Sequence, residues 1–399
     1  MSKIAFFCIP AHGHTNPTLG VVKELVQQGH EVWYYSYDIM KDKIESTGAH
    51  YISCDKYDNQ MNLKPEDADR VGKDIVFSTE LIVNTTLAMD EAILQELAAW
   101  EPDVVVADSV ATWGKLAALK LQIPFVSSTT TFAFNKHSAK VMKQMPSGLL
   151  SMLFSMKKAN KVVARLSEKG YPVDNVLSMI QNDNETNTIV YTSPEFQPCS
   201  ETFSDKYVFV GPSIRPLDYE VKKPKQTTIY ISMGTVNNQQ TTFFQNCIEA
   251  LKDSDYHVIM SIGELVDPAA LGRLPDNFTV KPSVNQMEVL QQADVFLTHC
   301  GMNSVNEALY YEVPLVLFPQ TNEQRGVANR VAQLGAGRML KAGSAKIIRS
   351  TVEEVLSDNH YKKEAIAISK GFKACGGAKQ AAQFILDNAK PATQDCQEM

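Results

Sequence analysis

The first 37 residues alternate between two hydrophobic patterns. Residues 4–9 form a continuous apolar run, and a second such run covers residues 31–37. Between them, apolar side chains recur at helical spacing, at Leu19, Val22, Leu25 and Val26. A strand, a helix and a strand in this order form a β-α-β unit, whose two strands run parallel. The sequence therefore predicts a doubly wound α/β fold.

The length of the chain and a restart of the same pattern predict two domains. A chain of 399 residues exceeds what one core usually covers. Periodicity is lost between Gly211 and Lys225, and a strand run at 228–232 starts the alternation again. The expected division is a first domain over 1–210, a linker over 211–226, a second domain over 227–375, a last helix over 376–390 and a loose tail over 391–399.

Composition excludes several classes of protein. The hydrophobic share of 44% and the charged share of 21% are ordinary for a globular protein, and no segment of about eighteen consecutive apolar residues occurs. A net charge of −7 without a long basic run argues against nucleic acid as a partner. Polar residues follow the first strand too soon for a signal peptide, so we expect a cytoplasmic protein. Seven Cys without a Cys-x-x-Cys pair indicate neither disulfides nor a metal site.

The segment 294–329 combines features of an anion site. The apolar run 295–298 ends near Gly301, and Asn303 or Ser304 can cap the helix that follows. The N–H groups and the dipole of a helix start favour an anion, and a glycine lets the backbone approach it closely. We therefore expect a phosphate group to bind here.

Further polar residues in this segment suit the rest of a nucleotide sugar. His299 adds a donor beside the helix start, and Glu307 could accept from ribose hydroxyls. Glu323 and Gln324 follow the next strand run, 315–319, and could bind a sugar. Each of these residues alone could simply cap a helix, but the whole set favours a nucleotide-sugar site.

His14 and Asp108 are candidates for acid-base chemistry. We expect His14 just outside a helix start, where the dipole favours a neutral imidazole that can accept a proton. Asp108 ends the strand run 103–107, at the edge where open α/β sheets bind ligands. A carboxylate bound to one ring nitrogen would fix the tautomer and stabilise the imidazolium. The alternatives are a solvated loop histidine and an aspartate that caps the next helix. The chain has neither Gly-x-Gly-x-x-Gly nor a P-loop motif.

The stretch Thr298-His299-Cys300-Gly301-Met302-Asn303-Ser304, with Glu307 and the later Glu323-Gln324, resembles the donor signature of family 1 glycosyltransferases. It is most similar to the bacterial macrolide glycosyltransferase group. The resemblance implies the GT-B arrangement, in which two Rossmann-like domains face each other across a cleft. It also implies that the last helix packs toward the first domain, which binds the acceptor, while the second binds the donor.

The resemblance assigns roles to individual residues. Gly13-His14-Thr15-Asn16-Pro17 matches the segment that carries the general base, and Asp108 matches its carboxylate partner. The family usually has an aromatic residue or Val followed by Pro-Gln where this chain has Ser283-Val284-Asn285-Gln286. Pyrophosphate binding is implied for His299, Gly301, Asn303 and Ser304, ribose binding for Glu307, sugar binding for Glu323 and Gln324, and other donor contacts for Thr129, Gly234, Thr235, Val284 and Gln286.

The activity implied is inverting transfer of a hexose from a UDP-sugar, with UDP-glucose preferred to a dTDP-deoxysugar. We expect no tightly bound cofactor and no metal, since no Asp-x-Asp occurs. The acceptor would be a small hydrophobic hydroxylated compound such as a macrolide, a flavonoid or another phenol. A monomer is favoured.

Methionines and other large apolar residues lie among lysines over residues 142–161, and three interpretations are open. The segment could line an adaptable hydrophobic pocket, rest on an anionic membrane or form a core helix. We favour the pocket. Rival functions are a peripheral-membrane transferase with a lipid acceptor, a UDP-sugar epimerase and a non-catalytic nucleotide-sugar sensor.

Overall fold

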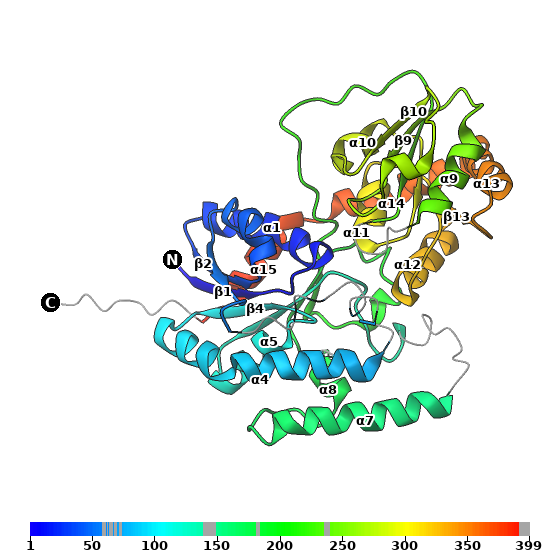
Figure 1. The fold of residues 1–399 in the computed structure, drawn as a ribbon. Helices are drawn as coiled ribbons and strands as arrows, with labels where there is room; N and C mark the ends of the chain where they lie inside the picture. The colour runs from blue at the N-terminus through cyan, green and yellow to red at the C-terminus, as the bar shows by residue number, and fades with distance from the viewer. Residues whose placement is uncertain are drawn as a thin grey trace. The chain divides into compact units, whose positions relative to one another are not determined.

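A computed structural model gives the structure of the 399-residue chain. It describes all residues except 58–60, 62, 64–66, 68–69, 72–73, 139–148, 181–183, 235–239 and 391–399, and it does not describe the side chains of 149–154 and 180. The chain forms two compact units (Figure 1). The first comprises Met1–Ser213 and the segment from Cys375 onward, and the second comprises Ile214–Ala374.

The first unit is built on a parallel sheet with seven strands in the described residues. Its strand order is β3-β2-β1-β4-β5-β6-β7. The strands are β1 (Lys3–Phe7), β2 (Glu31–Ser36), β3 (His50–Ser53), β4 (Val104–Asp108), β5 (Phe125–Thr129), β6 (Thr188–Val190) and β7 (Tyr207–Phe209).

Side chains alternate between the two faces of this sheet, and both faces are covered. Ile4 and Phe6 of β1 pack in one core cluster, while Ala5 and Phe7 pack in another. Burial on both faces explains why β1 is a continuous apolar run. The helices of this unit are α1 (His12–Gln27), α2 (Lys41–Glu45), α4 (Ile75–Trp100), α5 (Thr112–Leu121), α7 (Leu149–Ser167), α8 (Val176–Ile180) and α15 (Gly377–Asp387), with short 3-10 turns at Asp38–Met40 and Ser200–Thr202.

The last helix, α15, belongs to the first unit although it follows the second unit in the chain. Figure 1 shows it beside α1. Its buried side chains, Ala381, Ala382 and Ile385, join the cluster that contains Ile4 of β1. The backbone N–H of Gly377 donates to the carbonyl of Val210 at 2.9 Å. The C-terminal segment thus contributes to the core of the first unit.

The second unit has a parallel sheet of six strands among its described residues, in the order β10-β9-β8-β11-β12-β13. Its strands are β8 (Thr228–Ser232), β9 (His257–Ser261), β10 (Phe278–Lys281), β11 (Val295–Thr298), β12 (Leu315–Leu317) and β13 (Gly337–Met339). Its helices are α9 (Thr241–Leu251), α10 (Gln286–Gln292), α11 (Met302–Tyr310), α12 (Asn322–Gln333), α13 (Ala345–Ser357) and α14 (Asn359–Ala374), with a 3-10 turn at Pro268–Leu271. Two doubly wound parallel sheets confirm the predicted fold class.

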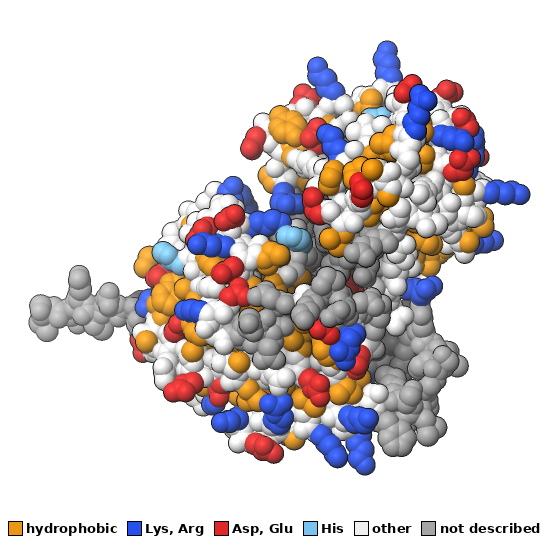
Figure 2. Space-filling view, viewed as in Figure 1, with side chains coloured by type: hydrophobic (Ala, Val, Ile, Leu, Met, Phe, Trp, Pro, Cys, Tyr) orange, Lys and Arg blue, Asp and Glu red, His pale blue; other side chains and the backbone are white. Residues whose placement is uncertain are grey.

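Acidic and basic side chains are interspersed on the face of each unit shown in Figure 2. This pattern agrees with the moderate net charge of −7. Within the ranges that the structure describes, no helix is long and apolar enough to cross a membrane.

Candidate active site

Each sheet has one point where its strand order reverses. In the first unit the chain runs outward from β1 through β2 to β3, and then returns to β4 on the other side of β1. In the second unit the same reversal lies between β8 and β11. Loops diverge at such switch points, and ligands of open α/β sheets bind there, beyond the carboxyl ends of the strands. The principal predicted residues lie at these two places.

His14 and Asp108 meet at the switch point of the first unit. Parallel pairing of β1 with β4 places Phe7 opposite Ala107, so the first turn of α1 comes close to the end of β4. Nδ1 of His14 lies 2.8 Å from Oδ2 of Asp108. The Asp108 side chain is fully buried, whereas that of His14 is 21% exposed. A carboxylate can only accept, so this contact places the ring hydrogen on Nδ1 and the lone pair on Nε2.

The structure corrects one expectation for this pair and excludes one alternative. His14 does not precede the helix but is the third residue of α1, which begins at His12 and tolerates Pro17 near its start. Asp108 does not cap the next helix, because α5 begins at Thr112 with Ala111 as its N-cap. Instead, its Oδ1 accepts from the N–H of Val110 at 2.9 Å. This bond holds the carboxylate while Oδ2 contacts the histidine.

His14 also contacts a third residue, Thr130, which the sequence analysis did not single out. The hydroxyl of Thr130 lies 3.2 Å from Nδ1 of His14. Thr129, for which a donor contact was predicted, is a buried residue at the end of β5. Several Ser and Thr residues follow one another at the end of β5, and this run could have suggested a hydroxyl contact with His14. The sequence alone does not show which of these hydroxyl groups faces His14.

His299 occupies the switch point of the second unit, directly after β11. A side-chain Cβ at Gly234 would lie 2.5 Å from its Nε2, and one at Gly301 would lie 2.7 Å from the same atom. The two glycines therefore make the space that the ring fills. Burial lowers the pKa of His299 to about 4, and a hydrogen bond with the backbone of Ser232 offsets this only in part. The ring is neutral at pH 7.

The packing of Gly301 against His299 predicts how one added methyl group, in Gly301→Ala, affects UDP binding. Gly301 has a φ of −61° and a ψ of 139°, which alanine adopts without strain, so Gly301→Ala acts through its contact with His299. We expect UDP binding, measured by calorimetry, to weaken at least about tenfold, the loss of one hydrogen bond to a charged group. Gly20→Ala is the matched control, because its Cβ would meet only ordinary contacts of 3.6 Å. Unchanged UDP affinity in Gly301→Ala would contradict this interpretation.

Helix α11 starts differently from the sequence prediction. Neither Asn303 nor Ser304 is its cap; the N-cap is Gly301, which has no side chain to satisfy the first N–H groups of the helix. The helix N-terminus next to His299 is thus suited to an anion, although the cap residues predicted for it were wrong.

Glu307 belongs to a hydrogen-bonded group that joins three elements. The amide Nε2 of Gln286, the first residue of α10, donates to Oε2 of Glu307 and lies 3.4 Å from the Ser304 hydroxyl. The Tyr230 hydroxyl on β8 donates to Oε1 of the same amide at 3.1 Å. Burial raises the pKa of Glu307 to about 7, although Gln286 and the charge of Arg215 lower it. Glu307 therefore titrates near neutral pH.

The predicted sugar-binding pair lies at the start of α12. Glu323 is exposed, whereas Gln324 forms a capping box with Thr321. Oε1 of Gln324 accepts from the N–H of Gln320 at 2.8 Å and from that of Thr321 at 3.2 Å. The amide is therefore held in place, with Nε2 as its donor.

The remaining predicted donor residues are half-buried or lie outside the described residues. Val284 and Asn303 are half-buried, and Ser283, where the family pattern is not matched, is exposed. Thr235 lies outside the described residues, as do Met142 and Met145 of the Met-rich segment. Within the part of the chain that is described, no group of three or more His, Cys, Asp or Glu could hold a metal ion.

The described part of the Met-rich segment packs as a core helix. From residue 155 onward, α7 lies along α4. Its buried side chains, Ala159, Val163 and Leu166, join a cluster with Val83 of α4, while Lys157, Lys158 and Lys161 are exposed. The lysines are therefore the solvent face of an ordinary amphipathic helix in this part.

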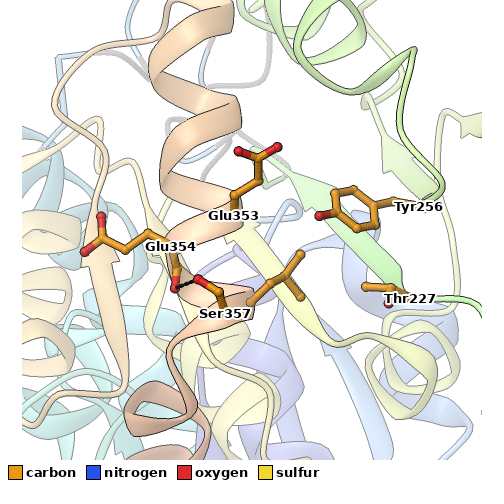
Figure 3. Close-up of a pocket in the computed structure, with 6 residues that line it drawn as sticks. Thr227, Tyr256, Glu353, Glu354 and Ser357 are labelled. Carbon is orange, nitrogen blue, oxygen red and sulfur yellow. Dashed lines mark hydrogen bonds between the residues drawn. The ribbon is translucent and has the colours of Figure 1, made fainter.

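A pocket of about 460 Å³ lies at the end of the second sheet that is opposite to the carboxyl ends of its strands (Figure 3). Thr227 immediately precedes β8 and Tyr256 immediately precedes β9, so the pocket lies at the amino ends of these strands. Its other lining residues are Glu353, Glu354, Leu356 and Ser357 of α13. Glu353 and Glu354 are paired with Arg349 and Arg338. None of the predicted site residues lines it.

Comparison with known proteins identifies the family. Residues 216–374, nearly the whole second unit, match the family described as UDP-glucoronosyl and UDP-glucosyl transferase. The chain is also 34% identical to the UDP-glucosyltransferase YojK of Bacillus subtilis, and the match covers 99% of both chains. The chain belongs to this family. It is a glycosyltransferase, and the resemblance predicted from the sequence is confirmed.

Other relatives agree with this assignment. The transferase is 30% identical to the demethyllactenocin mycarosyltransferase of Streptomyces fradiae, over 98% of this chain and 87% of that one. Its structure is similar to that of the calicheamicin glycosyltransferase, with a TM-score of 0.80 and 28% identity over 97% and 98% of the two chains. The structural relatives are GT-B glycosyltransferases, so the predicted GT-B fold is confirmed.

Proposed function

We propose that this glycosyltransferase moves a hexose, with glucose as the first choice, from a UDP-sugar to a hydroxyl of a small hydrophobic acceptor with inversion at C1. The observation that carries the proposal is the 2.8 Å contact of His14 with the buried carboxylate of Asp108. A sensor of nucleotide sugars would need the donor site alone, whereas this pair has the geometry of a general base and its orienting group.

In the proposed step, Nε2 of His14 takes the proton of the acceptor hydroxyl. The hydroxyl oxygen forms a bond to C1 of the sugar while the bond from C1 to the β-phosphate oxygen breaks, and the electron pair leaves with UDP. Asp108 stabilises the imidazolium that results and holds Nδ1–H in the required tautomer. Attack opposite the leaving group inverts the configuration at C1.

The second unit would bind the donor and stabilise the leaving group. His299 is a neutral donor at pH 7, and the N-terminus of α11 adds N–H groups to the same anion. Glu307 is buried beside these groups and, when ionised, would accept from the ribose hydroxyls. Glu323 and Nε2 of Gln324 would bind the transferred hexose.

The acceptor class is inferred from named relatives. A demethyllactenocin mycarosyltransferase and an oleandomycin glycosyltransferase are similar to this chain over nearly its whole length. We infer an acceptor of the same kind, a hydrophobic natural product with an accessible hydroxyl.

A screen of UDP release tests the proposal. Purified protein is incubated with UDP-glucose and one of a panel of macrolides, flavonoids, sterols, small phenols or lipid carriers, and released UDP is measured with product mass. We expect release with at least one compound of the hydrophobic natural-product class, with a mass gain of one hexose. Release with lipid carriers alone would favour the lipid acceptor, and an isomerised UDP-sugar without transfer would favour an epimerase.

A further inference from the structure

The hydroxyl of Tyr230 is buried at the donor side of the second unit and faces an amide rather than solvent. Tyr230 lies in the middle of β8 and is 2% exposed. Its ring stacks on Phe296 of β11, with centroids 4.4 Å apart and an interplanar angle of 14°. Stacking between neighbouring strands fixes the ring, so the position of the hydroxyl is fixed as well.

We propose that Tyr230 is a positioning residue for the nucleotide sugar, because its hydroxyl holds the Gln286 amide in the orientation that presents NH₂ to Glu307. This inference rests on the proposed function, in which Glu307 accepts from the ribose hydroxyls of the donor. Tyr230 acts on Glu307 through Gln286, and its hydroxyl also has a hydrogen bond with the Ser232 side chain.

The hydrogen-bond pattern supports one orientation of the amide. A carboxylate has no donor, so the NH₂ group of Gln286 must face Oε2 of Glu307. This turns Oε1 of the amide toward Tyr230, whose hydroxyl donates to it at 3.1 Å. In the reversed orientation, Oε1 would face the carboxylate oxygen and repel it. Tyr230 and the ionised Glu307 thus select the same state of Gln286.

Loss of the Tyr230 hydroxyl would favour protonation of Glu307. In Tyr230→Phe the amide oxygen loses its donor in a partly buried place, which is costly. The cost is relieved when Glu307 takes a proton, because its O–H can then donate to Oε1 of a reversed amide. Charged and titratable groups near Glu307 are Arg215, Tyr230 and Tyr311. Burial keeps the pKa of Tyr230 well above its usual range and also raises the pKa of Tyr311, so neither tyrosine changes charge near neutral pH, where Glu307 does.

Binding of UDP-glucose, measured by calorimetry from pH 5 to pH 9, tests this role. Binding avoids the titration of His14 that turnover would include, and the diphosphate of UDP-glucose has no terminal phosphate to titrate. For Tyr230→Phe we expect a Kd about 3- to 10-fold higher at neutral pH, the effect of one neutral hydrogen bond. We also expect the pH at which binding is half lost to move upward, which a merely structural change would not cause.

Two controls separate this role from general damage. Tyr361→Phe is the matched variant, since Tyr361 is also buried and its hydroxyl donates to Glu354 at 3.1 Å, away from the donor groups; its Kd should not change. The phenylalanine ring in Tyr230→Phe retains the stacking on Phe296, and a thermal melt confirms folding. In a Gln286→Met background, Tyr230→Phe should alter the Kd less than about twofold.

The possible outcomes are distinct. If wild-type protein binds UDP-glucose and Tyr230→Phe binds it equally well at every pH, the positioning role is wrong while the proposed function stands. An equal loss in the Gln286→Met background would also overturn the role, because Tyr230 would then act by another route. Failure of the wild-type protein to bind UDP-glucose or UDP would overturn the proposed function itself.

Discussion

Replacing His14 with alanine is expected to lower kcat for glucosyl transfer by roughly 10²- to 10⁴-fold, the usual contribution of a general base. The variant keeps the second unit intact, so UDP binding should change less than about twofold. Its kcat is measured by UDP release with the best acceptor from the screen, and its UDP affinity by calorimetry. Loss of UDP binding equal to the loss of turnover would contradict the assigned role.

Asp108→Asn tests the same pair from the other side. An asparagine has nearly the same shape, but its amide can present NH₂ to Nδ1 of His14 and then favours the wrong tautomer. We expect a loss of kcat of about the same order as in His14→Ala. A double variant should be little worse than either single variant, because both remove one functional unit. Additive losses would mean that the two residues act independently.

Replacing Glu307 with glutamine is expected to stabilise the protein and to abolish donor binding. The pKa of Glu307 is raised from 4.5 to about 7 by burial, so at pH 8 the folded protein holds a charge that it accommodates poorly. Glutamine removes this charge and retains an oxygen toward Gln286. A pKa shift of this size lowers the unfolding free energy of the wild type by roughly 3 kcal/mol at pH 8, and Glu307→Gln should regain about this amount.

The stability gained in Glu307→Gln should depend on pH. A raised pKa means that the folded state holds its proton more tightly, so the associated stability is full below pH 4.5 and is lost as the pH rises through about 7. The advantage of Glu307→Gln should therefore shrink to less than about 1 kcal/mol near pH 5. Chemical denaturation at pH 5 and pH 8 measures it. A variant that is less stable than the wild type at pH 8 would contradict the assigned burial cost.

The fold was predictable because its strands are buried on both faces. Continuous apolar runs identified β1, β8 and β11 closely, and parallel pairing then fixed the edge at which the site lies. The short strands β3 and β13 were missed. His50–Ser53 is only partly buried and Gly337–Met339 has a single buried residue, so neither shows a continuous apolar pattern.

The candidate site was predictable in its location but not in its internal contacts. His14, Asp108 and His299 follow strand runs, and the topology brings two of them together. The sequence could not show that Gly234 and Gly301 both lie against the imidazole ring of His299, or that Gln324 forms a capping box. Such contacts depend on distances below 3.5 Å between residues. The contact of Tyr230 with Gln286 joins residues 56 positions apart and needed the structure.

The anomeric configuration of the product tests whether transfer is a single displacement with His14 as the base. UDP-glucose carries its sugar in the α configuration, and a single displacement with His14 as the base gives a β-glucoside. Product from the wild-type enzyme and its best acceptor is analysed by proton NMR, where the coupling of the anomeric hydrogen separates the two forms. We expect only the β-glucoside from the wild type and almost none from His14→Ala. An α-glucoside, or undiminished β-glucoside from the variant, would contradict it.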